Sequence, residues 1–360
     1  MIIIIYIYME NTNIISFHHL IKPNKLKEQL PITENIRNLV INTRQEICNI
    51  IKGKSDKKLF IIGPCSIHNV NEALIYAKEL KNLADLVRDK ILIVMRVYFE
   101  KPRTTIGWKG LINDPFLDNS FQVNKGLELA RKLLLDINNI GLPCGYEVLD
   151  TITPQYISDL MSWGAIGART TESQVHRQMV SGLSMPVGFK NGTSGSIVVA
   201  RDAVMSARYP HCFMGITDKG NPSICTTRGN KDCHVILRGG IDGPNFYFNN
   251  ISDASNLMLE KKLYPAIMID CSHGNSLKDH RNQTMVLDTT LLNMKIKKNI
   301  IGCMIESNIN EGKQTLENDV IKYGVSITDA CIGLPETFKM ILRAHQKLNK
   351  DYSEINIKSI

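Results

Sequence analysis

The sequence predicts an α/β protein, a (β/α)8 barrel of the TIM type with an N-terminal extension and an inserted β-hairpin before strand six. Three observations support this fold. Eight short runs rich in Ile and Val alternate with longer amphipathic stretches over residues 58–348, as parallel strands alternate with helices. The stretch at about residues 211–228 breaks this alternation, because it contains two strand-like runs and no helical pattern. A chain of 360 residues is long enough for one large barrel.

The first segment, residues 1–57, is predicted to be a helical extension that precedes the barrel. Thr33 suits a helix N-cap, because its hydroxyl can accept a hydrogen bond from the first turn. The helix is expected to end at Gly53. Its apolar residues recur at helical spacing: Ile36, Val40, Ile47, Ile50 and Ile51.

The barrel is predicted to span residues 58–348, followed by a C-terminal tail at 349–360. Its strands are expected in the runs LFIIGPCS, ILIVMRVYF, CGYEVLD, GAIGART, VGFKN, VILRGG, AIMIDCSHG and IIGCMIES. Helices are expected at 71–88, 122–139, 153–162, 172–182, 195–207, 251–262, 279–294 and 335–348. The hairpin insertion is predicted at about 211–228, around the turn signal Lys219–Gly220–Asn221–Pro222.

Charge and cysteine usage indicate the class of protein. The net charge is +8, but no run of five basic residues occurs, so we expect an anionic metabolite as ligand and no nucleic-acid partner. The nine cysteines show no spacing typical of a disulfide framework. We expect reduced thiols in a cytoplasmic protein, mostly as core residues in apolar surroundings: Cys48, Cys212, Cys303 and Cys331.

The opening MIIIIYIYME is apolar over eight residues. It lacks a basic start and a small-residue cleavage site, and it is too short to span a bilayer. We therefore expect neither a signal peptide nor a membrane anchor. Translation from Met9 instead of Met1 stays an open alternative.

Polar residues follow nearly every predicted strand. Buried parallel strands carry few charges, and the carboxyl ends of barrel strands converge on the face that holds active sites. The residues at these ends are Cys65, Arg96, Lys101, Glu147, Arg169, Lys190, Arg238, His273 and Glu306, with Asp329 following in SITDACIG.

A first group among these residues has the donor types of a metal site. It consists of Cys65, His273, Glu306 and Asp329. Thiolate, imidazole and carboxylates together suit a divalent transition metal: Mn, Fe, Co, Zn or Cu. The alternative is that each residue is structural on its own, as a core cysteine, a hydrogen-bonded histidine and surface carboxylates.

A second group is cationic. It consists of Arg96, Lys101, Arg169, Lys190 and Arg238. Cations that face one pocket repel each other unless an anion neutralises them, so a small, multiply anionic ligand is expected. Arg103 and Thr104 in EKPRT offer a second phosphate contact. The alternative is that these side chains form salt bridges or extend to solvent.

Long motifs carry a resemblance to a known family: IGPCSIH, IVMRVYFEKPRTTIGWKGLINDP, DLMSWGAIGARTTESQVHRQ, PVGFKNGTSG, HVILRGG, MIDCSHGNS, GCMIESNINEG and YGVSITDACI. Over residues 30–345 the chain resembles the type I 3-deoxy-D-arabino-heptulosonate 7-phosphate synthases, also called phospho-2-dehydro-3-deoxyheptonate aldolases. The resemblance implies a metal-dependent transferase that condenses phosphoenolpyruvate with D-erythrose 4-phosphate. This reaction is the first step of the shikimate pathway to the aromatic amino acids.

The resemblance also implies residue roles. The metal ligands would be Cys65, His273, Glu306 and Asp329. Phosphoenolpyruvate would be held by Arg96, Lys101, Arg169, Lys190 and Arg238. Arg103 and Thr104 would help to bind erythrose 4-phosphate. Lys101 and Glu147 are candidate proton donors, because they would share the pocket.

The resemblance further implies feedback inhibition by an aromatic amino acid and a homodimer or homotetramer built partly through the extension. The effector site would be lined by Asp150, Pro154, Gln155, Ser184, Phe213 and Gly215. Glycine at 215 favours tyrosine, since serine there accompanies phenylalanine binding in the family. The alternative is that Phe213 and Pro154 only pack.

Three other functions stay open on the sequence. 3-Deoxy-octulosonate 8-phosphate synthase shares the barrel and the phosphoenolpyruvate chemistry, although EKPRTT and the hairpin favour the seven-carbon product. A Schiff-base aldolase could form its imine on Lys190. A catalytically silent amino-acid sensor could keep the fold, although it would need neither the metal-type nor the cationic group.

Overall fold

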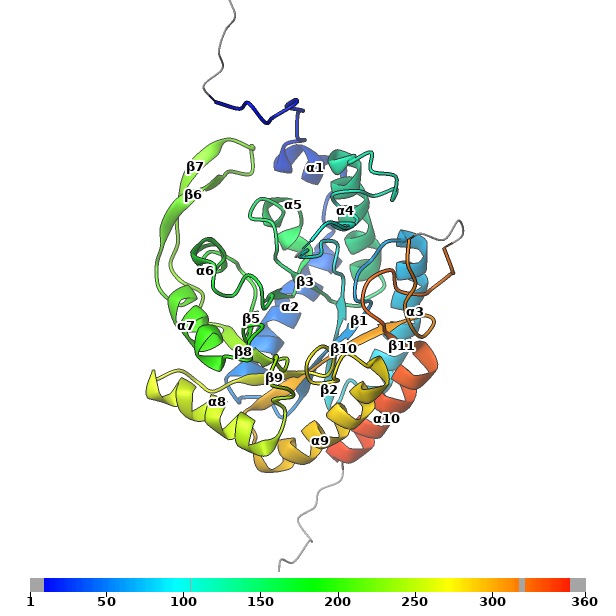
Figure 1. The fold of residues 1–360 in the computed structure, drawn as a ribbon, viewed down its shortest axis with the longest axis vertical. Helices are drawn as coiled ribbons and strands as arrows, with labels where there is room; N and C mark the ends of the chain where they lie inside the picture. Colours follow the sequence, from blue (N-terminus) through cyan, green and yellow to red (C-terminus); the bar gives the residue numbers. More distant parts are fainter. Residues whose placement is uncertain (1–9, 104, 317–320, 350–360) are drawn as a thin grey trace, which may run out of the picture.

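A computed structural model describes residues 10–103, 105–316 and 321–349 of the chain (Figure 1). Eight parallel strands form a closed barrel, because the strand order runs β1-β2-β3-β4-β5-β8-β9-β10 and β10 pairs again with β1. The predicted fold class is confirmed. The barrel strands are β1 (Lys58–Gly63), β2 (Ile91–Arg96), β3 (Cys144–Glu147), β4 (Trp163–Ile166), β5 (Val187–Lys190), β8 (Cys233–Leu237), β9 (Ile267–Asp270) and β10 (Ile300–Asn308).

Most strands end earlier than the apolar runs suggest. Cys65 lies two residues beyond β1 and His273 three beyond β9, so these side chains stand on loops above the barrel. β11 (Ile332–Gly333), a short strand absent from the predicted runs, pairs with the end of β10.

Helices surround the barrel, one after each strand (Figure 1). Their apolar faces pack on the outer side of the sheet in one large hydrophobic cluster. They are α3 (Val70–Val87), α4 (Val123–Asn139), α5 (Pro154–Ile157) with η1 (Ser158–Leu160), α6 (Gln174–Val180), α7 (Ile197–Ala207), α8 (Phe248–Glu260), η2 (His280–Asn282) with α9 (Gln283–Ile296), and α10 (Leu334–Asn349).

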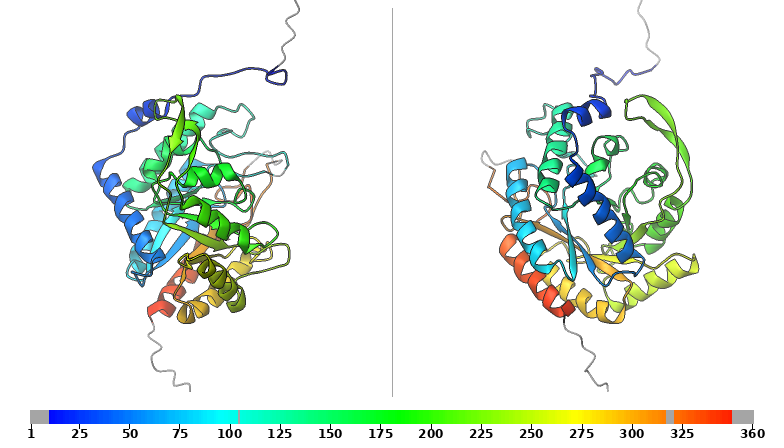
Figure 2. Two further views of the ribbon diagram at one scale, coloured as in Figure 1. Left: turned by 90° about the vertical axis from the view of Figure 1, so that its left-hand side faces the viewer. Right: turned by 180° about the vertical axis from the view of Figure 1, so that it is seen from behind.

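The extension forms α1 (Pro23–Gln29) and α2 (Glu34–Ile51). The Thr33 hydroxyl accepts a hydrogen bond from the Ile36 amide, as predicted, and Gly53 adopts a left-handed φ of 65° just past the helix. The last turns of α2 pack on the inward-facing residues of the barrel strands. Figure 2 shows α2 lying across the back of the barrel, away from the loops that follow the strands.

The hairpin comprises β6 (Cys212–Ile216) and β7 (Pro222–Thr226), paired antiparallel. It arches beside α5 and α6, and its tip reaches α1 (Figure 1), where the Asn24 amide donates to the Asp218 carbonyl at 2.7 Å. The expectation that Cys212 is a core residue is wrong, because the hairpin stands outside the barrel and exposes this side chain. All nine cysteines are free thiols.

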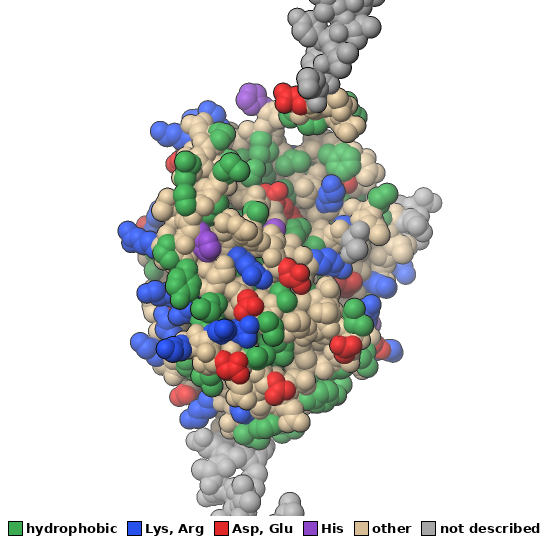
Figure 3. Space-filling model, turned by 60° about the vertical axis from the view of Figure 1, so that its left-hand side comes forward, with side chains coloured by type: hydrophobic (Ala, Val, Ile, Leu, Met, Phe, Trp, Pro, Cys, Tyr) green, Lys and Arg blue, Asp and Glu red, His purple; other side chains and the backbone are tan. Residues whose placement is uncertain are grey.

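The surface carries charges of both signs. Basic and acidic side chains are interspersed on the face shown in Figure 3. Among the described residues, no helix is long and apolar enough to cross a membrane.

A buried histidine inside the barrel gives a first prediction. The Trp163 indole donates to His234 Nε2 at 3.0 Å, and the imidazole is fully buried. Burial lowers the pKa of His234 to about 4, from 6.5 for an exposed histidine. Below pH 6.5 the unfolded chain therefore binds more protons than the folded one, and stability falls as the pH drops toward 4.

From pH 7.5 to pH 5.0, this residue is expected to reduce the free energy of unfolding by about 2 kcal/mol. Urea unfolding at the two pH values measures the loss. In His234→Gln, the amide still accepts the indole hydrogen bond but does not titrate, so the loss should be smaller by that amount. An equal pH dependence in both proteins would contradict the assignment.

Candidate active site

A cavity of about 370 Å³ opens at the carboxyl ends of the strands. Arg96 and Cys65 are fully buried beneath it. Thr104, the other predicted phosphate contact beside Arg103, lies outside the described residues. The predicted site residues that line the cavity are Lys101, Arg103, Glu147, Arg169, Lys190, Arg238, His273, Glu306 and Asp329.

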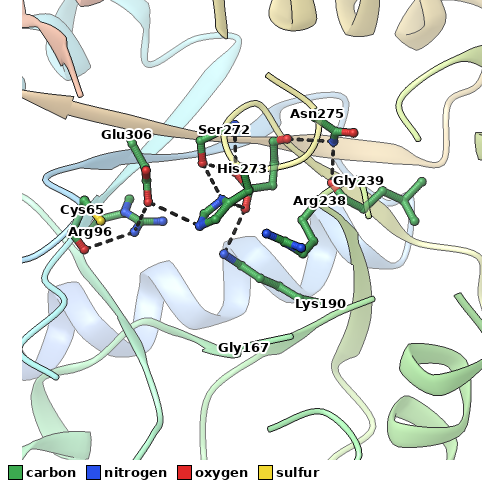
Figure 4. A network of polar contacts seen from close by, with 12 residues as sticks. Cys65, Arg96, Gly167, Lys190, Arg238, Gly239, Ser272, His273, Asn275 and Glu306 are labelled. Carbon is green, nitrogen blue, oxygen red and sulfur yellow. Dashed lines mark hydrogen bonds and ion pairs between the residues drawn. The ribbon is translucent and has the colours of Figure 1, made fainter. Parts of the chain in front are cut away.

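Three of the four predicted metal ligands converge. One donor atom each of Cys65, Glu306 and Asp329 lies within 4.8 Å of the others. The fourth, His273, points its Nε2 toward this group, at 3.8 Å from Glu306 Oε1 (Figure 4). The structure thus brings together a thiol, an imidazole and two carboxylates from the ends of three strands and from the loop before β11.

The chemistry of these donors fits a divalent transition metal. The Cys65 thiol donates to Asp329 Oδ2 at 3.6 Å. Burial, and then the nearby Glu306 carboxylate, raise the pKa of Cys65 to about 11. A thiol in this position is therefore protonated at neutral pH unless a cation stabilises the thiolate. A bound transition metal would do so, and the mixed sulfur, nitrogen and oxygen donors suit it.

Arg96 lies at the junction of the two groups. Its Nη2 donates to Glu306 Oε1 at 3.0 Å, and its guanidinium lies over the Tyr98 ring at 3.9 Å from the centroid. Among the described residues, no hydrogen-bond acceptor reaches its buried Nη1. A buried donor without an acceptor destabilises the folded protein. An anion bound in the cavity could accept the missing hydrogen bond.

The other cations surround the same space. Lys101 Nζ donates to both the carbonyl and the Sγ of Cys65 at 3.1 Å. Arg238 lies near Arg169, and burial together with that neighbouring charge lowers the pKa of Arg238, against the effect of Asp270. Such crowding of like charges favours a multiply anionic ligand.

Glu147 approaches the cavity closely because the facing residue is glycine. A Cβ built on Gly167 would lie 2.1 Å from Glu147 Oε1. The glycine of the GAIGART run therefore makes room for the carboxylate, which is buried but borders the cavity.

Asp270 is a site residue that the sequence reasoning missed. It is fully buried at the end of β9, and its Oδ2 lies 2.9 Å from Lys190 Nζ and 2.9 Å from His273 Nδ1. Although burial raises its pKa, Lys190 and His273 hold the pKa well below the ordinary value. The available signal was its position at a strand end, three residues before His273 in MIDCSH.

Three cationic or titratable residues at the cavity were also missed: Lys278, His280 and Lys313. Lys278 and Lys313 stand on loops beyond the strand ends, and His280 begins the short helix η2, so the strand pattern does not show that they reach the cavity. Two cavity-lining residues of the loop after β9 have a positive φ: 63° for Lys278 and 60° for His273. Such backbone strain is typical of functional loops.

The predicted effector residues lie on the hairpin side of the barrel. Asp150 is in the loop after β3, where its carboxylate accepts hydrogen bonds from the Ile152 and Thr153 amides. Pro154 and Gln155 begin α5, Ser184 is in the α6–β5 loop, and Phe213 and Gly215 are in β6. The Tyr156 hydroxyl of α5 donates to the Ile21 carbonyl at 2.5 Å, and the Asn24 amide of the extension donates to the Asp218 carbonyl of the hairpin. The extension therefore contacts both α5 and the hairpin.

The fold and the cavity define a class of protein: a TIM-barrel protein with a cation-lined cavity at the carboxyl ends of its strands, the face where enzymes of this fold have their active sites. The comparison with protein families is more specific. The DAHP synthetase I family matches residues 29–343, and the chain belongs to this family of transferases.

Named relatives agree with this assignment. The chain is 54% identical over 320 residues to the Phe-sensitive phospho-2-dehydro-3-deoxyheptonate aldolase of Escherichia coli K12, covering 88% of this chain and 91% of that protein. It is 49% identical over 344 residues to the Tyr-sensitive enzyme of the same strain, covering 95% and 96%. The solved phospho-2-dehydro-3-deoxyheptonate aldolase of Francisella tularensis SCHU S4 superposes with a TM-score of 0.92 at 49% identity, covering 93% and 98%.

Proposed function

We propose that this protein condenses phosphoenolpyruvate with D-erythrose 4-phosphate to give 3-deoxy-D-arabino-heptulosonate 7-phosphate and inorganic phosphate, with the help of one divalent metal ion (Mn, Fe, Co, Zn or Cu). The observation that carries the proposal is the convergence of Cys65, Glu306 and Asp329 donor atoms within 4.8 Å, beside a cavity lined by cations. The cations suit the binding of phosphoenolpyruvate, and the metal donors suit the activation of the aldehyde.

The cations would bind phosphoenolpyruvate through its phosphate and carboxylate. Arginine pairs with either group through two parallel hydrogen bonds, and lysine adds a point charge. The proposed residues are Arg96, Lys101, Arg169, Lys190 and Arg238. Arg103, at the exposed rim, and Thr104 would hold the phosphate of erythrose 4-phosphate.

The chain's residues would position two substrates for one carbon–carbon bond. C3 of phosphoenolpyruvate attacks the aldehyde carbon of the tetrose, and the aldehyde oxygen takes up a proton. Water then adds to C2, and the resulting hemiketal phosphate collapses with release of inorganic phosphate. A metal held by Cys65, His273, Glu306 and Asp329 would supply Lewis-acid polarisation of the aldehyde.

Lys101 and Glu147 are the candidates for proton transfer. Both border the cavity, and Lys101 Nζ is 3.1 Å from Cys65 Sγ, beside the metal donors where the aldehyde oxygen would develop charge. A proton donor positioned at that point lowers the activation free energy of the condensation, because the proton does not have to come from bulk water.

The decisive experiment is product formation from phosphoenolpyruvate with two sugar phosphates. We expect turnover with erythrose 4-phosphate, little with arabinose 5-phosphate, and none after treatment with a chelator. Restoration by added Mn²⁺ is the control for chelator damage. Preference for arabinose 5-phosphate would favour the octulosonate synthase instead, and absence of turnover with both sugars would favour a silent sensor.

A Schiff-base mechanism has less support. Imine formation needs a neutral, nucleophilic lysine amine, whereas Lys190 Nζ is buried in an ion pair with Asp270 at 2.9 Å. Borohydride treatment in the presence of substrate should therefore leave no covalent adduct on Lys190.

We also propose inhibition by an aromatic amino acid, tyrosine rather than phenylalanine, at Asp150, Pro154, Gln155, Ser184, Phe213 and Gly215. One contact supports the choice at position 215. A Cβ on Gly215 would lie 2.8 Å from Cys225 Sγ on the paired strand β7, so serine, the residue that accompanies phenylalanine binding in the family, would have to displace this thiol.

Gly215→Ser is expected to weaken tyrosine inhibition about 5- to 150-fold, since overpacking of this size costs about 1–3 kcal/mol. Inhibition curves with tyrosine and with phenylalanine measure the change. The double variant Gly215→Ser/Cys225→Ala relieves the contact and separates packing from the effect of the hydroxyl. Strong inhibition of the unmodified protein by phenylalanine alone would contradict the choice of tyrosine.

A cytoplasmic homodimer or homotetramer, assembled partly through the extension, completes the proposal. Support comes from apolar side chains that residues 10–20 leave exposed: Ile14, Ile15 and Phe17. Figure 2 shows this segment extending away from the barrel. Sedimentation of the full chain, compared with a chain that starts at residue 22, tests the role of the segment.

A further inference from the structure

Asp270 is buried behind the cavity and contacts one member of each functional group. Its side chain is fully buried, and it is not among the residues that line the cavity. Through the single oxygen Oδ2 it contacts Lys190 Nζ and His273 Nδ1, each at 2.9 Å. Figure 4 shows Lys190 and His273 side by side, with the His273 ring extending toward Glu306.

The hydrogen bonds around Asp270 determine which nitrogen of His273 carries the proton. Ser272 donates its backbone amide and its hydroxyl to Asp270 Oδ1, at 3.1 and 2.7 Å. The hydroxyl proton is therefore committed, and Ser272 Oγ, 2.6 Å from His273 Nδ1, can only accept there. Asp270 Oδ2 also only accepts. Nδ1 must carry the proton, and Nε2 presents its lone pair toward Glu306.

The same oxygen is the counter-ion of Lys190. Both side chains are buried, so the pair is little screened by solvent. When the cavity holds an anion, the phosphate and Asp270 compete for the lysine ammonium. Asp270 therefore favours a cation at His273 and opposes an anion at Lys190.

We propose that Asp270 is a positioning residue that orients His273 for the metal and acts as the resident counter-ion of Lys190. The proposal rests on the metal and phosphoenolpyruvate sites of the proposed function. It makes a specific claim: loss of the Asp270 charge weakens metal binding without weakening the binding of phosphoenolpyruvate. A residue that merely supports the fold would weaken both.

Asp270→Asn tests this claim by calorimetric titration of the metal-free full-length protein, with Mn²⁺ and separately with phosphoenolpyruvate. We expect the Kd for Mn²⁺ to rise about 10- to 100-fold, the usual effect of losing a carboxylate behind a metal-bound histidine. The Kd for phosphoenolpyruvate should stay the same or fall, because the cavity has gained net positive charge. An unchanged Mn²⁺ affinity, or weaker binding of both ligands, would overturn the proposal.

Asp288→Asn is a matched control. Asp288 pairs with Arg343 and Lys347 between α9 and α10, and it does not border the cavity. This variant loses the same charge by the same substitution and should change neither affinity. A parallel change in Asp288→Asn would assign the effect to overall charge and overturn the role of Asp270.

A measurement on the unmodified protein covers the case in which Asp270→Asn does not fold. The ¹⁵N chemical shifts of the histidine side chains report the tautomer, and His273→Gln identifies the signal. We expect Nδ1–H and an unprotonated Nε2 in the metal-free protein, and the opposite tautomer would overturn the orienting role. Absence of Mn²⁺ binding by the unmodified protein would instead refute the proposed metal site, while the tautomer still decides the orientation of His273.

Discussion

Cys65→Ala is expected to abolish metal-dependent turnover, with a loss of at least about 1000-fold in kcat. The reason is that the thiol is one of the three donors within 4.8 Å of each other, and alanine offers no donor. A metal's contribution to stabilising charge in the transition state is several kcal/mol, and each 1.36 kcal/mol corresponds to tenfold in rate. Steady-state assays with saturating Mn²⁺ measure the loss.

The loss must be separated from general damage to the protein. Cys65 is fully buried, so alanine leaves a small cavity that costs some stability. Cys48 is half-buried in α2, which lies across the back of the barrel, away from the cavity. Cys48→Ala removes the same thiol there and should keep full activity. Near-normal turnover of a folded Cys65→Ala protein would refute the ligand role.

The barrel was predictable because its strands are buried on both faces. Uninterrupted runs such as FIIG in β1 and IMID in β9 have no other simple explanation when helical stretches separate them. The hairpin was predictable because the turn signal at Lys219–Gly220 falls where a helix is missing. Strand β11 was not predictable, because a strand of two residues shows no periodic pattern and because a long loop brings it beside β10.

The candidate site was predictable where it depends on strand ends, since topology alone brings those residues to one face. Cys65, Glu306 and His273 illustrate this: they are far apart in sequence and close in the structure. The alternating pattern does not show which charged side chains form ion pairs. It did not show that Lys190 is neutralised by Asp270 or Arg96 by Glu306, because such pairs depend on side-chain directions across neighbouring strands.

The second large effect is expected at that Arg96–Glu306 pair. Both side chains are buried, with Nη2 and Oε1 3.0 Å apart. Removing one partner of a buried ion pair leaves an uncompensated charge and costs about 3–5 kcal/mol. Arg96→Met should therefore reduce the free energy of unfolding by that amount, measured by urea unfolding with the fluorescence of the buried Trp163 and Trp108 as probe. It should also reduce kcat/KM for phosphoenolpyruvate at least about 30-fold, because a charged contact is lost.

A double variant distinguishes the two roles of Arg96. Arg96→Met/Glu306→Gln replaces the ion pair by neutral groups of similar size, which is often close to neutral for stability. Most of the lost unfolding free energy should return, whereas activity should not, because a cation for the substrate and a carboxylate for the metal are both missing. Strictly additive losses of stability would mean that the two residues are not coupled. In that case Arg96 would serve the ligand alone, and its contact with Glu306 would contribute nothing to holding the metal donors in place.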